Sequence, residues 1–263
     1  LRSDSELVRR AAVAASGFIP LQHRWPLLKE LITDPSASVR HEVANQLAGY
    51  TQQVQGADYI ALSKLLREYE QQLLISQDMP GGQAAMAVYA LNQGDAERAL
   101  GAINKALEIE PDFAPALLNL ADLYRSMGDE VKAKDTLERA ITAAPDSGAI
   151  QHSFGLYWIR QKEISKALSY LKAATERDDR NSRYFYVYAV AQESEGRIDG
   201  AIETLKQANK VWPNQYDLLI TLIMYLEKSG KTSESWTYLS NLSAIAPNDP
   251  QVKRWIAEMR REK

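Results

Sequence analysis

The sequence predicts an all-α protein built as an α-solenoid, a right-handed superhelix of helix-turn-helix repeats. Three ladders of small or turn-forming residues carry this prediction, and each recurs every 34 residues or a multiple of that spacing. Glycine forms one ladder at Gly94, Gly128, Gly196 and Gly230, and proline forms another at Pro111, Pro145, Pro213 and Pro247. Alanine forms the third, twice in each repeat, at Ala99, Ala133, Ala167 and Ala201 and at Ala106, Ala140, Ala174 and Ala208. Independent ladders on one period indicate stacked repeats, each a pair of helices.

Each ladder has a physical role in such a pair. Glycine supplies the positive φ of the turn between the two helices, and Asp95 and Asp129, which follow two of these glycines, are expected to cap the second helix. A small alanine near the start of the second helix lets the two helices approach closely, so Ala133 and Ala201 are predicted at tight contacts. Proline ends the second helix. In the middle repeat these glycine and proline places are taken by Lys162 and Asp179.

One segment carries the whole pattern. The stretch APALLNLADLYRSMGDEVKAKDTLERAITAAP, residues 114–145, resembles the tetratricopeptide repeat family, whose signature places are filled by Leu120, Ala121, Tyr124, Gly128, Ala133, Leu137, Ala140 and Pro145. The resemblance implies five repeats over residues 80–247, beginning near Pro80, Ala114, Gly148, Ser182 and Tyr216. Residues 248–263 are predicted to follow as a capping helix, in which Val252, Trp255, Ile256 and Met259 recur at helical spacing.

The stretch SRYFYVYAVAQ, residues 182–192, tests this register. Aromatic and β-branched residues favour strands, so local propensity alone predicts a β-strand here. The 34-residue period instead places the stretch in the first helix of the fourth repeat. By likeness to the family, Tyr184, Phe185, Tyr188 and Ala189 then point into the solenoid, and Tyr186 points toward its concave face.

Residues 1–56 follow a different pattern. The segments SELVRRAA and ASVRHEVA place the pairs Val8-Arg9 and Val39-Arg40 31 residues apart, each after a helix-start signal. They resemble a pair of short HEAT-like repeats, another α-solenoid unit. Residues 57–79 are predicted to form a long connecting helix. Gly81 and Gly82 after it are interpreted as a linker, since no P-loop or strand accompanies them.

The composition argues against several classes of function. The formal net charge of -3 gives no basic field for nucleic acid, and no apolar run reaches the ~18 residues of a membrane-spanning helix. The chain has no cysteine, its three histidines are far apart, and no catalytic motif appears. We therefore expect no catalytic residue, no metal site and no cofactor in this chain, which begins without methionine and is interpreted as a fragment or processed product.

Solenoids bind partners on their concave face. By likeness to the family, places five, nine and twelve of each first helix line a groove, with further residues at its edge. The predicted contacts there are Leu118, Asn119, Asp122, Arg125, His152, Leu156, Tyr186, Val190, Glu193 and Met224. A protein or peptide is the expected partner, although adjacent first helices could instead bury these apolar residues against each other. Ala84 and Val88 take two places of the Lys/Asn/Arg clamp that grips a chaperone carboxylate, which argues against that ligand.

The order of these segments along the chain also resembles that of a more specific group of proteins. A HEAT-like pair, the opening ISQDMPGGQ and repeats containing RYFYVYAVAQESEGRIDGAI are similar to the C-terminal region of bacterial periplasmic multihaem c-type cytochromes. That family carries its CxxCH haem sites upstream, so haem c is implied for the parent protein alone, in the periplasm. Two alternatives remain: a scaffold for envelope assembly or secretion without a redox link, and a solenoid appended to a catalytic domain. The oligomeric state is left open.

Overall fold

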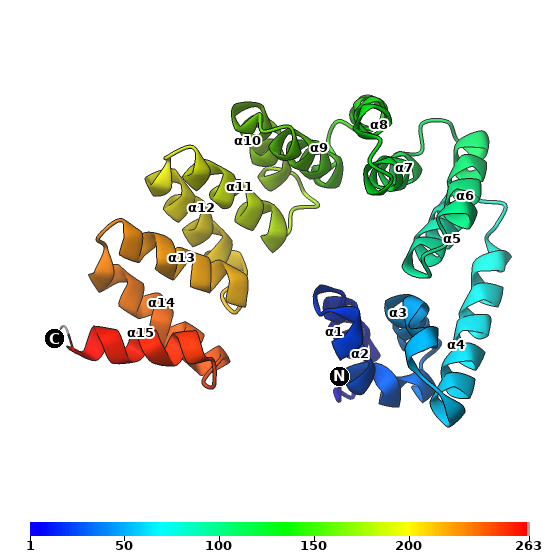
Figure 1. The fold of residues 1–263 in the computed structure, drawn as a ribbon, viewed down its shortest axis with the longest axis horizontal. Coiled ribbons are helices and arrows are strands. Elements are labelled where there is room, and N and C mark those ends of the chain that lie inside the picture. The colour runs from blue at the N-terminus through cyan, green and yellow to red at the C-terminus, as the bar shows by residue number, and fades with distance from the viewer. Residues whose placement is uncertain (262–263) are drawn as a thin grey trace. The chain divides into compact units, whose positions relative to one another are not determined.

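The computed structural model describes residues 1–261, and every regular element in that range is a helix (Figure 1). Five helix pairs follow one another from Pro80: α5 (Pro80–Asn92) with α6 (Ala96–Ile109), α7 (Ala114–Ser126) with α8 (Glu130–Ala143), α9 (Gly148–Arg160) with α10 (Ile164–Thr175), α11 (Ser182–Ser194) with α12 (Ile198–Val211), and α13 (Tyr216–Lys228) with α14 (Thr232–Ile245). Their first helices begin at the five residues where the sequence placed the repeats. The predicted all-α solenoid is confirmed.

The turn inside each pair follows the glycine ladder. Gly94, Gly128, Gly196 and Gly230 have φ between 74° and 80°. Lys162, at the glycine place of the middle repeat, has a φ of 62° and is the one non-glycine residue with positive φ in the described part of the chain. The side chains of Asp95 and Asp129 accept hydrogen bonds from the amides of Arg98 and Lys132, so the predicted caps form.

The aromatic stretch is the helix α11, as the period predicted. Tyr184, Phe185 and Ala189 are buried, and Tyr188 is half-buried. The ring of Phe185 meets Trp212 edge-on at 5.6 Å between centroids. Burial among neighbouring helices therefore outweighs the local preference of these rings for a strand.

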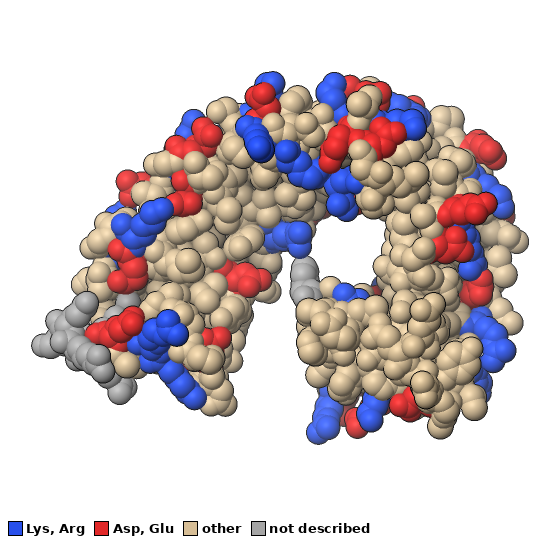
Figure 2. All heavy atoms as spheres, viewed as in Figure 1, with Lys and Arg blue, Asp and Glu red and all other residues tan. Residues whose placement is uncertain are grey.

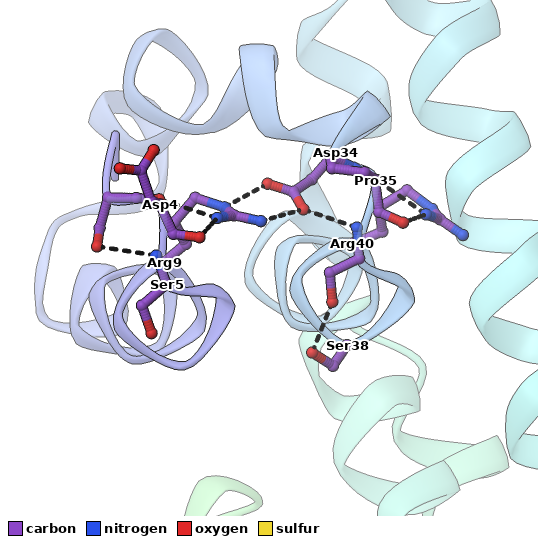
Figure 3. A network of polar contacts seen from close by, with 9 residues as sticks. Asp4, Ser5, Arg9, Asp34, Pro35, Ser38 and Arg40 are labelled. Atoms are coloured by element: carbon purple, nitrogen blue, oxygen red, sulfur yellow. Dashed lines mark hydrogen bonds and ion pairs between the residues drawn. The ribbon is translucent and has the colours of Figure 1, made fainter.

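Four helices precede the repeats: α1 (Glu6–Ala15), α2 (Leu21–Leu28), α3 (Ala37–Leu47) and α4 (Gly56–Ile75), with short 3-10 segments at 16–18, 29–33 and 48–53. The arginine within each of the two echoing segments, Arg9 or Arg40, binds the start of its own helix (Figure 3). The Nη1 of Arg9 donates to the carbonyls of Ser3 and Asp4, and that of Arg40 donates to those of Asp34 and Pro35. The echo is thus structural, while its assignment to HEAT-like repeats stays a prediction.

The same arginines also pair with acids further along the chain. Arg9 pairs through two nitrogens with the buried carboxylate of Asp34, at 2.7 and 3.0 Å, and Arg40 pairs with Glu68 of α4. The Arg9 guanidinium holds the pKa of Asp34 below its ordinary value. We call this arrangement, in which each arginine binds the start of its own helix and an acid about 25 to 28 residues further along the chain, the arginine ladder.

The chain forms two compact units, which divide between Ala143 and Ala144. Unit 1 joins α1–α4 to the first two repeats through one continuous core, from Val13 to Leu123. Gly49 lies so close to the end of α5 that an added Cβ would be 2.5 Å from the carbonyl oxygen of Asn92. The predicted boundaries at residues 56 and 79 separate segments of different repeat type. They stay a prediction, since the shared core of unit 1 includes residues on both sides of each boundary.

Unit 2 contains the last three repeats and α15 (Pro250–Arg261). Val252 of α15 is buried against Leu219, Ile223, Leu239 and Leu242, as expected for a capping helix. The side chains of Met259 to Arg261 and the residues 262 and 263, which belong to the predicted cap, lie outside the described residues.

Ala133 is 1% exposed and Ala201 is 0% exposed, so both second helices leave no room at these places. Replacing either alanine by leucine is expected to lower the free energy of unfolding by roughly 1–3 kcal/mol, because the extra carbons must displace packed neighbours. Urea unfolding followed by circular dichroism measures the effect. Ala96→Leu, on an exposed alanine of α6, is the control and should leave the midpoint unchanged; an equal midpoint for Ala133→Leu would contradict the register.

Candidate protein-docking surface

The predicted contact residues divide between the two units. Leu118, Asn119, Asp122 and Arg125 lie on α7 in unit 1. Asp122 and Arg125 are exposed and form an ion pair at 3.3 Å, while Asn119 is half-buried and donates to the carbonyl of Ala84 at 3.4 Å. Leu118 is half-buried. Unit 1 therefore presents a polar surface at these places, with its charges already paired.

His152 of α9 lies in the interior, with a side chain 6% exposed. Its ring centroid is 4.7 Å from that of Tyr184, and neither ring nitrogen has a hydrogen-bond partner within the described structure. Burial, with a smaller contribution from the charge of Arg183, lowers its pKa from 6.5 to about 4. Because the ring of Tyr184 covers it, His152 differs from the other predicted contacts and offers no open surface to a partner.

Three predicted residues form an apolar row in unit 2. Leu156, Val190 and Met224 occupy the ninth place of three successive first helices, α9, α11 and α13. Leu156 is half-buried, Val190 is 37% exposed and Met224 is 51% exposed. We call these three residues the ninth-place row.

Polar and aromatic side chains accompany this row. Tyr186 is half-buried and packs against the core formed by α11, α12 and α13. Glu193 is half-buried and pairs with Lys228 of the next first helix. Burial and the nearby charge of Glu193 raise the pKa of Tyr225 to about 12. The predicted contact places on α9, α11 and α13 are thus mainly apolar, and the carboxylate of Glu193 is held there by its ion pair with Lys228.

The periodic pattern missed an open pocket of about 310 Å³ in unit 1, between α4, α5 and α6. Its walls include the apolar side chains of Leu73, Leu74 and Met86 and the cations of Arg98 and Lys105. The pocket depends on how α4 packs on the first repeat, and no 34-residue ladder extends to α4. Sequence periodicity therefore gave no signal for it.

The charges on the visible face are mixed. Figure 2 shows Lys and Arg interspersed with Asp and Glu, without a large patch of one sign. Among residues 1–261, no group of three or more His, Asp or Glu side chains is placed to hold a metal ion. No helix in the described range is both long enough and apolar enough to cross a bilayer.

Comparison with known proteins identifies the repeats. Models of the family described as tetratricopeptide repeat match residues 90–153 and 155–215. Interferon-induced protein with tetratricopeptide repeats 2 of Cricetulus griseus is 26% identical over 168 residues, covering 62% of this chain and 35% of that relative. The chain spans between 8% and 35% of the length of the curated relatives it matches.

Two solved structures share the fold. PilW, a type IV pilus biogenesis factor, superposes with a TM-score of 0.56 at 16% identity, over 68% of this chain and 86% of that one. YrrB, described as having an unusual peptide-binding site, superposes with a TM-score of 0.52 at 19% identity, over 70% of this chain and 95% of that one. With helix pairs on a 34-residue period and family models that match residues 90–153 and 155–215, this part of the chain is built of tetratricopeptide repeats.

Proposed function

We propose that this chain is a non-catalytic scaffold that docks another protein, and that unit 2 binds it through the ninth-place row. The observation that carries the proposal is the exposure of Val190 and Met224 on successive first helices. Two large apolar side chains at equivalent places of neighbouring first helices offer a partner apolar surface, whose burial contributes about 25 cal/mol for each Å². Repeat arrays characteristically use such surfaces for binding.

The partner class follows from the chemistry of the ninth-place row. Apolar side chains spaced by one repeat suit an amphipathic helix or an extended peptide with regularly spaced aliphatic residues. Glu193 is paired with Lys228 and therefore favours no strongly charged ligand. The peptide-binding site described for YrrB, which shares the fold, is compatible with this class.

Changing Val190 and Met224 together to aspartate is expected to abolish partner capture and leave the helix content unchanged, because both side chains are exposed. The measurement is a pull-down of natural partners, with far-ultraviolet circular dichroism on the same samples. Val131→Asp is the matched control, since Val131 is 72% exposed and lies in unit 1. Capture of the same proteins by the folded double variant and by the control would contradict the proposed surface.

For the parent protein we propose a periplasmic multihaem cytochrome c in which this chain is the docking region. Support comes from the order of parts, an N-terminal pair of echoing helices followed by the repeats and RYFYVYAVAQESEGRIDGAI. The chain has no cysteine and holds no covalent haem itself. A visible spectrum of the full-length protein is expected to show a Soret band, and several CxxCH motifs should be encoded upstream. An upstream region without CxxCH motifs would contradict the cytochrome proposal and leave the proposed docking role unaffected.

The alternative is a scaffold for envelope assembly without haem. The fold likeness to PilW, a pilus biogenesis factor, favours it. A full-length protein with a signal peptide and no haem absorbance would select this alternative.

A further inference from the structure

The pocket between α4, α5 and α6 in unit 1 combines an apolar wall with positive charge. Leu73, Leu74 and Met86 line it, together with Arg98 and Lys105, and none of the described residues that line it is an aspartate or a glutamate. Leu74 is 45% exposed, so part of this apolar wall faces water. A ligand that covers the wall would remove that apolar surface from water, which favours binding.

The two cations of the pocket differ in their partners. Arg98 pairs with Glu70 of α4, and its Nη2 also contacts the sulfur of Met86 at 3.5 Å, so its charge is balanced and its side chain is held in place. Lys105 lies seven residues further along α6 and therefore on the same face of that helix. Its side chain is exposed and makes no ion pair with any described residue. The pocket thus has one cation without a partner.

Gly101 lies between these cations and also lines the pocket. In the middle of α6 a glycine destabilises the helix relative to alanine. An added Cβ would meet no neighbouring atom within 4 Å, so packing does not require a glycine here. The equivalent place of the other four second helices carries a side chain, at Asp135, Ser169, Glu203 and Thr237. A glycine that weakens its helix and that packing does not require indicates a functional reason, and its effect is to widen the pocket.

We propose that this pocket binds an aliphatic monocarboxylate, a free fatty acid of medium chain length. The carboxylate binds the ammonium group of Lys105, and the hydrocarbon chain lies against Leu73, Leu74 and Met86. One unpaired cation matches one negative charge, and a hydrogen bond between two charged groups is among the stronger ones. The volume of about 310 Å³ is at the small end of the range for ligand sites, which suits a single short chain.

The polar groups of the pocket suit a fatty acid better than a peptide. Its walls come from helices, whose backbone groups bond to one another, so the pocket has no strand edge with which a peptide backbone could pair. The side-chain amide of Gln83 already donates to the carbonyl of Gln77 at 2.6 Å. A peptide brings an amide group with every residue, whereas a fatty acid brings one polar group at one end.

Calorimetric titration of the 263-residue chain with sodium decanoate, below the concentration at which decanoate forms micelles, tests the proposal. We expect saturable binding of one decanoate per chain. Lys105→Gln should weaken it about tenfold, as expected for the loss of one hydrogen bond to a charged group. Gly101→Leu should weaken it by about tenfold or more, because the new side chain occupies the pocket. Arg139→Gln is the matched control: Arg139 takes the place of Lys105 in the next repeat, and its loss should leave the affinity unchanged.

Three results would overturn the proposal: no saturable binding of decanoate, equal affinity for decan-1-ol, which lacks the charge, or unchanged affinity in both pocket variants. Tighter binding of N-acetyl-dileucine than of decanoate would also overturn it, because the pocket would then suit the C-terminus of a peptide. Circular dichroism of each variant establishes that it is folded. The pocket lies in unit 1, so the result is independent of partner capture through the ninth-place row in unit 2.

Discussion

Replacing Gly82 by alanine is expected to destabilise unit 1 by about 3 kcal/mol, while the same change at the adjacent Gly81 is expected to stabilise it by about 0.5–1 kcal/mol. Both glycines lie in the first turn of α5. A Cβ on Gly82 would be 1.8 Å from the carbonyl oxygen of Ser76 at the end of α4, and that oxygen already accepts from the amide of Met79. A Cβ on Gly81 meets nothing within 4 Å.

Hydrogen exchange of the α4 and α5 amides, together with urea unfolding, measures the two effects. Gly82→Ala should speed hydrogen exchange in both α4 and α5, since the added methyl group forces the two helices apart. Gly81→Ala replaces a flexible residue by a good helix former at a position where the methyl group meets no neighbour. Equal stability of the two variants would show that α4 and α5 do not approach as closely as described. The interpretation of Gly81 and Gly82 as a linker is wrong, because both residues lie within the helix α5.

Acid is expected to destabilise unit 2 through His152. The folded chain holds this imidazole at a pKa of about 4, against 6.5 ordinarily. Above pH 6.5 the histidine is neutral in both states and has no effect. Between pH 6.5 and 4 the unfolded chain binds a proton that the folded chain does not, so stability falls by about 2–3 kcal/mol between pH 7 and pH 4.5.

The comparison that isolates this effect is between the native chain and His152→Phe, which keeps a ring beside Tyr184 but cannot be protonated. The difference in free energy of unfolding between the native chain and His152→Phe should change by about 2–3 kcal/mol between pH 7 and pH 4.5. Tryptophan fluorescence suits the measurement, because four of the five tryptophans, Trp158, Trp212, Trp236 and Trp255, lie in unit 2. His23→Gln, at an exposed histidine, should follow the native chain; a similar response at both sites would contradict the burial of His152.

The period of the sequence was sufficient to predict backbone conformation. It placed Lys162 at a glycine position, and that lysine has the positive φ of its glycine equivalents. It also placed the rings of residues 184–188 on a helix, against their local preference. These features depend on the backbone geometry of one helix pair, which every repeat shares. The conformation of one repeat could therefore be predicted from the pattern of the other repeats.

Contacts between particular side chains were not predictable in this way. His152 falls on a groove place, yet the ring of Tyr184 from the next repeat covers it. Asp179, at a proline place, accepts from the amides of Gly148 and Ala149 and so holds the start of α9. Such contacts depend on the size and charge of one residue about 30 positions away, which a repeat pattern does not specify.

The neighbour-to-neighbour packing of these helices has a consequence for synthesis on the ribosome. The hydrogen bond between Asn92 and Asn45 spans 47 residues, and the ion pairs and other hydrogen bonds described above join residues that are closer in the chain. At about 5–20 residues per second, a ribosome delivers such a partner within about ten seconds. Each helix pair can therefore be packed while the next is being translated, so a nascent chain exposes the apolar surface of little more than one repeat at a time.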